Sequence, residues 1–383
     1  MGNIAEHPAL VPNMAEIEAM PDNGFRVVST FTGCGGSCLG YRWAGFRALW
    51  ASEFVPAARE VYKLNFPGVT VDDRDIREVQ PEEILEATGL QKGELDVLEG
   101  SPPCASFSSA GSREAAWGEV KKYSDTKQRT DDLFFEFVRI IEGVQPKVFV
   151  AENVKGLLIG KAKGYFKEIF RAMEGAGYKV SCRLLDAQFF GVPQHRERAI
   201  FIGVREDLGI EPSHPKPQTE PVPLKVALPW IEKRGANSSF GSEDEWVSSE
   251  QPSATIGTSA NTGNGRSAPG MCASIEGYAI GDEWDKLKPG EQSKRYFQLV
   301  KADPEKPSPA ICQSSANFLS NASVVHPTEK RKFTIPELRR ICGFPDDFQL
   351  TGSFGQQWER LGRAVPPPMM KAIAEHIRDH ILT

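Results

Sequence analysis

Short apolar runs recur along the first half of the chain, and stretches with apolar residues at helical spacing separate them. Apolar runs bounded by glycine, proline and polar turn residues are typical of buried strands. They predict strands at 26–31, 46–52, 69–71, 96–99, 147–151, 179–185 and 199–203. Helical spacing predicts helices at 15–20, 38–44, 131–143, 165–174, 336–343 and 369–381. Strands that alternate with helices predict an α/β fold built on a largely parallel sheet.

The pattern changes after the last predicted strand. Six prolines lie between Pro212 and Pro229, and the segment 253–270 is rich in Ser, Asn, Gly and Thr. Prolines and small polar residues at this density favour loops, so we expect a separate, smaller, loop-rich domain here. It contains a local basic and aromatic cluster, which is a weak indication of nucleic-acid binding: Lys286, Lys288, Lys294, Arg295 and Tyr296.

Composition and charge are those of an ordinary globular protein. The chain has 383 residues, of which 40% are hydrophobic and 25% charged. Its net charge of -6 excludes a surface that is basic all over and binds nucleic acid everywhere. A local basic cleft on an otherwise acidic surface is compatible with this charge. The cysteines show no CxxC pair or zinc-type spacing, and His195 and His326 lack partners at ligand spacing, so we predict no metal site. Because we find no signal peptide and no apolar run of membrane-spanning length, we expect a soluble cytoplasmic protein with reduced thiols.

The first predicted strand runs directly into a glycine-rich turn, 32–37, and then into a helix. Strand, glycine-rich turn and helix form the layout of a nucleotide-type cofactor site, although a plain tight turn has the same pattern. Glu53 ends the second strand, where such folds place the acceptor for ribose hydroxyls. Asp75 and Ile76 follow the third strand and could bind an adenine by a hydrogen bond and by packing. The alternative is that both acids are solvated loop residues.

Reactive side chains follow two further strands. In Gly100-Ser101-Pro102-Pro103-Cys104 the prolines fix the backbone before the cysteine, which makes Cys104 a candidate nucleophile; a buried, inert cysteine is the alternative. Glu152 ends a strand that leads to the same sheet edge and is a candidate proton donor. Arg196 and Arg198 alternate along an extended segment, so they share a face and could hold a base carbonyl, a phosphate or Glu152. An exposed salt-bridge pair is the alternative for these arginines.

Six segments, in this order, together resemble one family, the DNA cytosine-5 methyltransferases that use S-adenosylmethionine. The segments are Phe31-Thr32-Gly33-Cys34-Gly35-Gly36, Pro103-Cys104, Glu152-Asn153-Val154, Gln194-His195-Arg196-Glu197-Arg198, the stretch from Arg331 through Phe344-Pro345-Asp346, and Gly362 to Pro367. The resemblance implies a Rossmann-like class I methyltransferase sheet with an inserted, smaller target-recognition domain. It places the catalytic, cofactor-binding domain at 1–205, completed by 355–383, and the target-recognition domain at 206–354.

The resemblance also implies a reaction: transfer of a one-carbon group from the sulfonium cofactor to carbon 5 of a cytosine flipped out of double-stranded DNA. Cys104 would form a covalent adduct at carbon 6, Glu152 would protonate N3, and Arg196 and Arg198 would complete the catalytic set. The base that removes the carbon 5 proton is left unassigned. The expected cofactor-binding residues are Phe31, Thr32, Gly33, Cys34, Gly35, Gly36, Glu53, Asp75, Ile76, Ser101, Pro102, Arg363, Ala364 and Val365. We expect a monomer that modifies bacterial or phage DNA, with a cognate restriction endonuclease as a candidate partner in the cell.

One position departs from the family. Its last motif usually reads Gly-Asn, and this chain has Gly362-Arg363. Arg363 could make a structural hydrogen bond or ion pair, or its guanidinium could select an anionic cofactor, carboxy-S-adenosylmethionine, which would make the protein a DNA cytosine-5 carboxymethyltransferase. Two further alternatives stay open: cytosine-5 methylation of tRNA by a related fold, and a non-catalytic DNA-binding protein.

Overall fold

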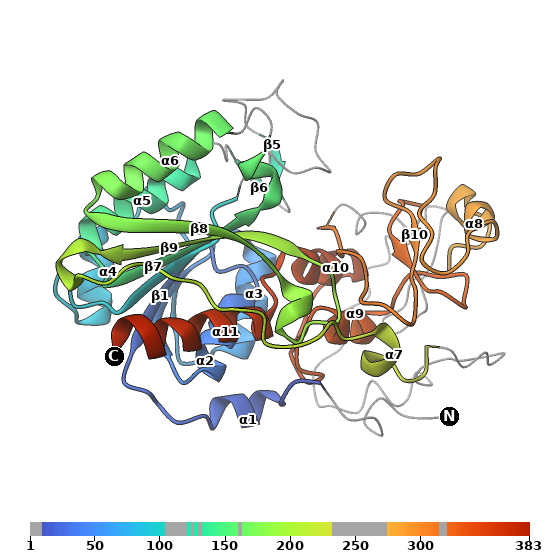
Figure 1. The fold of residues 1–383 in the computed structure, drawn as a ribbon, viewed down its shortest axis with the longest axis horizontal. Coiled ribbons are helices and arrows are strands. Elements are labelled where there is room, and N and C mark those ends of the chain that lie inside the picture. Colours follow the sequence, from blue (N-terminus) through green and yellow to red (C-terminus); the bar gives the residue numbers. More distant parts are fainter. Residues whose placement is uncertain are drawn as a thin grey trace, which may run out of the picture.

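A seven-stranded sheet forms the centre of the larger lobe (Figure 1). The computed structural model describes residues 10–103, 121–123, 126–128, 132–159, 163–231, 274–313 and 320–383. The strand order is β3-β2-β1-β4-β7-β9-β8. The first five strands of this order are parallel, and β9 is antiparallel to both of its neighbours. The α/β class with a Rossmann-like sheet is therefore confirmed.

The strands of this sheet lie close to the predicted positions. They are β1 Arg26–Thr30, β2 Arg47–Ser52, β3 Thr70–Asp72, β4 Val97–Gly100, β7 Val148–Val154, β8 Tyr178–Asp186 and β9 Glu197–Arg205. The helices of this lobe are α1 Met14–Glu18, α2 Gly36–Trp43, α3 Pro56–Asn65, α4 Pro81–Thr88, α5 Leu133–Val144, α6 Lys163–Gly175, α10 Phe354–Arg363 and α11 Pro367–Ile377. A short hairpin is formed by β5 Lys121–Tyr123 and β6 Thr126–Gln128.

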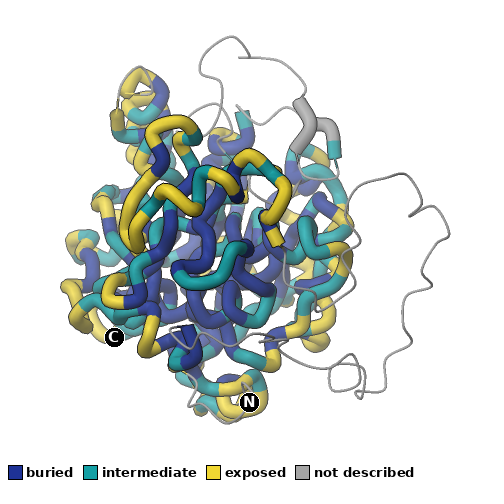
Figure 2. Tube along the Cα trace, turned by 90° about the vertical axis from the view of Figure 1, so that its right-hand side faces the viewer, coloured by how far each residue is buried: buried dark blue, intermediate teal, exposed yellow. Residues whose placement is uncertain are grey.

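Both faces of the sheet are covered, which explains why its strands read as nearly continuous apolar runs. Successive strand residues point to opposite faces. Thus Leu98 packs in the core shared with α4, α5 and α6, whereas Val97 packs in the core shared with α2 and α11. In Figure 2 the buried residues fill the middle of the molecule and the exposed ones follow its outline.

The C-terminal segment returns to the sheet. The helix α11 packs against α2, and Gly40 lets the two approach closely, because a Cβ there would lie 2.6 Å from both the Met370 Cβ and the Pro367 carbonyl oxygen. Residues at the end of the chain are therefore part of the same core as the first strand and helix.

The smaller lobe has few regular elements, as its sequence predicts (Figure 1). It contains α7 Leu224–Ala227, α8 Ala279–Trp284, α9 Ile335–Ile341, and a parallel pair formed by β10 Val300–Lys301 and β11 Val324–Val325. A small core of its own consists of Ile275, Ile280, Leu299 and Val325. The base of the lobe, including Leu224, Phe333 and Leu338, shares a core with Cys34, Tyr62 and Trp358 of the larger lobe.

Candidate active site

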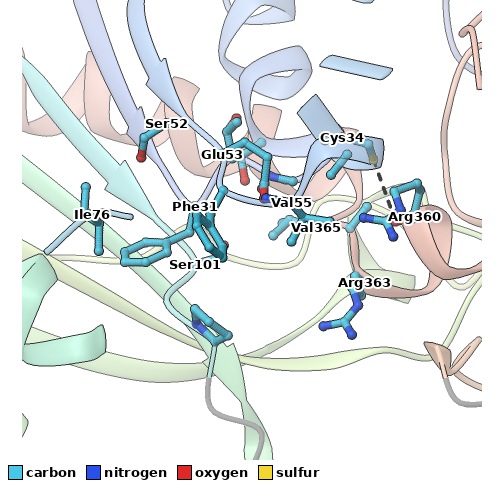
Figure 3. Close-up of a pocket in the computed structure, with 18 of the residues that line it drawn as sticks. Phe31, Cys34, Ser52, Glu53, Val55, Ile76, Ser101, Arg360, Arg363 and Val365 are labelled. Carbon is cyan, nitrogen blue, oxygen red and sulfur yellow. Dashed lines mark hydrogen bonds between the residues drawn. The ribbon is translucent and has the colours of Figure 1, made fainter. Parts of the chain in front are cut away.

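One pocket lies at the carboxyl edge of the sheet, where β1, β2 and β4 end. It is lined by most of the residues predicted to bind a cofactor: Phe31, Thr32, Gly33, Cys34, Gly36, Glu53, Asp75, Ile76, Ser101, Arg363, Ala364 and Val365. Gly35 and Pro102 are the two predicted residues that do not line it. In Figure 3 Ile76 lies at one side of the pocket and Arg360 and Arg363 at the other, with Glu53 and Val55 between them.

The glycine-rich turn takes a backbone shape that few side chains allow. Phe31 has a positive φ of 54°, and Gly33 and Gly35 have φ values of 59° and 96°. A Cβ on Gly36 would lie 2.3 Å from the carbonyl oxygen of Val365. Glycine at this position therefore lets the turn touch the last predicted motif, more than three hundred residues further along.

Glu53 is held by this turn. Its two carboxylate oxygens accept hydrogen bonds from the backbone N–H groups of Gly33 and Val55, each at 2.7 Å. Burial raises the pKa of the Glu53 carboxyl, and these two donors act against that rise. The carboxylate thus sits at a fixed place in the pocket wall, and each oxygen keeps a lone pair for a ligand hydroxyl.

Two arginines fix the opposite side of the pocket. The Arg77 guanidinium binds Asp75 at 2.8 Å and Asp132, which precedes α5, at 2.5 Å. From within α5, Arg139 donates to the backbone carbonyls of Ile76 at 2.8 Å and Val79 at 3.0 Å. The turn that carries Asp75 and Ile76 is therefore attached to α5.

The proline-rich turn after β4 leads from the pocket toward the predicted nucleophile. Ser101 and Pro103 line the pocket, and the Asn153 side chain of β7 donates to the Pro102 carbonyl at 3.1 Å. Cys104 itself lies outside the described residues. The residue before it in the sequence, Pro103, is part of the pocket wall.

Glu152 and Arg198 form an ion pair at 2.6 Å, with both side chains largely buried. The antiparallel register of β7 and β9 pairs Val154 with Arg198, which puts the guanidinium one step along the same sheet face from Glu152. Of the alternatives that the sequence left open for Arg198, the structure shows contact with Glu152.

Arg196 makes different contacts. It is buried, and its guanidinium donates to the carbonyl of Ile311 at 3.2 Å and to that of Gly362 at 3.0 Å. These carbonyls belong to the smaller lobe and to α10. Arg196 does not line the pocket, so its contacts support a positioning role, and its predicted place in the catalytic set stays a prediction.

Arg363 lies at the end of α10 and lines the pocket (Figure 3). Its Nε is 2.8 Å from a carboxylate oxygen of Glu359, one turn earlier in the same helix. The departure from the family thus combines both features considered from the sequence, an ion pair and a position at the cofactor pocket.

Several pocket and near-pocket residues were not predicted. Arg74, Leu133 and Arg360 line the pocket, and Glu99 is buried beneath the glycine-rich turn, where the Ser29 hydroxyl donates to its carboxyl. Burial raises the pKa of Glu99 to about 8. An acidic residue in an otherwise apolar strand is a signal that could have identified Glu99.

The described parts of the chain contain no cluster of three or more metal-ligating side chains. Within these parts no helix combines the length and apolarity that crossing a bilayer requires.

The sheet and its pocket define a class: an α/β protein of Rossmann-like fold with a pocket at the carboxyl edge of its sheet, where such folds bind their ligands. A family model described as C-5 cytosine-specific DNA methylase matches residues 25–379. The chain is 32% identical over 355 residues to the Type II methyltransferase M1.HphI of Haemophilus parahaemolyticus, covering 91% of this chain and 86% of that protein. It is 30% identical over 361 residues to M.NgoPII of Neisseria gonorrhoeae, covering 93% and 96%. A prophage-encoded E. coli protein has the same fold, with a TM-score of 0.69, 22% identity, and coverage of 94% of this chain and 100% of that one.

The chain belongs to the C-5 cytosine-specific DNA methylases. It is a DNA cytosine-5 methyltransferase, and membership of the family implies S-adenosylmethionine as the methyl donor and a covalent mechanism through cysteine.

Proposed function

We propose that the pocket binds S-adenosylmethionine and that cytosine is methylated at its Pro103 side. The observation that carries this proposal is that a single pocket unites the glycine-rich turn, Glu53, the Asp75-Ile76 turn, the residue before Cys104 and the last motif. The lining suits the cofactor, since it offers a fixed carboxylate for ribose hydroxyls, an Asp and an apolar side chain for adenine, and a backbone turn without Cβ atoms for close approach.

The protein's own groups prepare the cytosine. Carbon 5 is a poor nucleophile until a group adds to carbon 6. The Cys104 thiolate forms a bond to carbon 6 while Glu152 delivers a proton to N3, so the electrons of the ring double bond become available at carbon 5. Arg198 holds the Glu152 carboxyl in place through their ion pair. The bound cofactor supplies an electrophilic methyl group, and loss of the carbon 5 proton then allows the bond to Cys104 to break.

The DNA is double-stranded, and the target base must leave the stack to reach the pocket. In this proposal the residues 206–354 form the target-recognition domain, and 1–205 with 355–383 form the catalytic domain. Type II names among the relatives support a role in bacterial restriction and modification, with a cognate endonuclease as partner. A cytoplasmic monomer fits this role.

A second candidate rests on Arg363. Because its guanidinium lines the pocket, it could bind the additional carboxylate of carboxy-S-adenosylmethionine, and the product would be 5-carboxymethylcytosine. The ion pair with Glu359 already neutralises this charge, which favours methyl transfer as the activity.

The test is mass spectrometry of nucleosides from random-sequence duplex DNA incubated with the protein and both cofactors in competition. We expect 5-methylcytosine, and its loss in Cys104→Ala. If 5-carboxymethylcytosine dominates for the native chain and 5-methylcytosine for Arg363→Asn, Arg363 selects the cofactor. If the duplex stays unmodified while tRNA is methylated, the proposed substrate is wrong.

A further inference from the structure

Phe297 is a large apolar side chain on the surface of the smaller lobe. It is 73% exposed, more than any other large hydrophobic side chain in the described ranges. Removing such a side chain from water is favourable, so leaving it exposed gives up stability that burial would contribute. A single exposed apolar residue is common on proteins, and the surroundings of Phe297 decide whether it has a role.

The turn that carries Phe297 is firmly braced. The buried Ser293 hydroxyl donates to Glu283 of α8 at 2.8 Å and accepts from the backbone N–H groups of Arg295 and Tyr296, both at 3.0 Å. Tyr296 packs against the small core of the lobe, to which the buried Leu299 belongs. The turn therefore holds its inward side in the core and presents Lys294, Arg295 and Phe297 to solvent.

Neither of the two cations beside Phe297 forms a close ion pair within the described part of the chain. Neither Lys294 nor Arg295 forms an ion pair with any carboxylate of the described residues, and the Arg295 guanidinium lies 5.2 Å from the centre of the Tyr296 ring. Four other lysines of the lobe are paired, and the exposed Lys288 is not paired with any described carboxylate: Lys225 pairs with Glu305, Lys286 with Glu283, Lys306 with Asp303 and Lys330 with Asp285. Among the described residues Lys294 is thus unpaired at this turn, and Arg295 acts on Glu283 from beyond ion-pair distance, where, after the hydrogen bond from Ser293, it helps to lower the pKa of that carboxyl.

We propose that the turn from Gln292 to Phe297 is a DNA-contact element, in which Lys294 and Arg295 bind backbone phosphates and Phe297 packs against bases or sugars in a groove. Proteins that deform DNA combine an apolar wedge with flanking cations in this way. DNA, which the family modifies, carries the charge opposite to that of Lys294 and Arg295, so we take DNA as the partner. The inference rests on the proposed function, since it takes DNA as the substrate.

The test measures binding of a fluorescein-labelled, random-core duplex by anisotropy over a salt series. We expect Phe297→Ala to weaken binding by about tenfold and Phe297→Trp to restore it. Replacing both Lys294 and Arg295 by alanine should reduce the slope of log affinity against log salt by about two. The matched controls are Val226→Ala, another exposed apolar residue of the lobe, and Lys306→Ala, whose charge is paired with Asp303.

Binding of Phe297→Ala equal to that of the native chain would overturn the inference, and DNA methylation by the native chain would then still support the proposed function. If the native chain neither bound nor methylated the duplex, both the inference and the proposed function would be overturned. If the native chain formed a dimer in sedimentation velocity and Phe297→Ala abolished that dimer, the turn would contact a second copy of the chain. This result would also overturn the inference.

Discussion

Glu99 lies at the carboxyl end of β4, beneath the cofactor pocket, and is almost fully buried. The groups that face it are the hydroxyls of Ser29 and Ser37, the thiol of Cys38, the hydroxyls of Tyr41 and Tyr62 and the carboxyl of Glu152. None of these is a cation, so burial dominates and raises the pKa of Glu99 from its usual 4.5 to about 8.

This shift predicts a pH-dependent stability. Between about pH 5 and pH 8 the unfolded chain has lost the Glu99 proton and the folded chain keeps it, so the free energy of unfolding falls as pH rises by about 1.4 kcal/mol per pH unit from this group. Glu99→Gln removes the titration. Urea unfolding should therefore show that the free energy of unfolding of Glu99→Gln, minus that of the native chain, increases as the pH rises over this range. The exposed Glu60→Gln on α3 is the control, and a difference for Glu99→Gln that is constant with pH would contradict the prediction.

Among elements, α5 has a role beyond covering the sheet. Through Asp132 at its N-terminal side and Arg139 within it, α5 holds the turn that carries Asp75 and Ile76. In the proposed complex this turn would contact the adenine, so α5 would set the position of one end of the cofactor.

We expect Arg77→Ala to raise the KM for S-adenosylmethionine by about tenfold and to leave kcat within about twofold, since removing a charged hydrogen bond costs about 1.5–3 kcal/mol. Steady-state kinetics with saturating DNA measures both constants. Arg77→Lys should recover part of the loss. Arg26→Ala, which breaks an exposed ion pair with Asp22, is the control. If Arg77→Ala and Arg26→Ala changed KM and kcat to the same extent, the contact of Arg77 would have no specific role in cofactor binding.

Most elements of the sheet could be predicted from the sequence, because buried parallel strands read as apolar runs. The helices α3 and α4 could not, since each begins with a proline that reads as a chain break although proline suits a first helical turn. The helix α10 was also missed. Its polar face, Gly362 in its last turn and its capping box of Ser353 with Gln356 read locally as a loop.

At the scale of the whole molecule, Arg196 joins the two lobes. One guanidinium binds a carbonyl of the smaller lobe and a carbonyl of α10, directly before Arg363. These contacts support a role for Arg196 in the relative position of the lobes, and its place in the catalytic set stays a prediction. Sequence alone could not separate the two roles, because both need a buried arginine and the partners are distant backbone carbonyls. By contrast Arg198 could be linked to Glu152 by strand pairing alone.

Removing Arg196 should loosen this junction. Arg196→Met leaves two buried carbonyls without donors, and we expect the free energy of unfolding to fall by about 2–4 kcal/mol. Arg196→Lys should not restore stability, because one ammonium cannot reach both carbonyls. Urea unfolding measures the change, with Arg183→Met on β8 as the control. If Arg196→Met had the same free energy of unfolding as the native chain, Arg196 would not stabilise the contact between the lobes.

The central claim is that Cys104, which follows the pocket residue Pro103 in the sequence, attacks the cytosine ring in DNA. The most direct measurement is the intact mass of the protein after incubation with S-adenosylmethionine and random-sequence duplex DNA that contains 5-fluorocytosine. Fluorine at carbon 5 cannot leave as a proton does, so the adduct should accumulate on the native chain, be absent from Cys104→Ser, and form more slowly on Glu152→Gln. A native chain that methylates ordinary DNA but forms no adduct, or an adduct that persists in Cys104→Ser, would contradict the account.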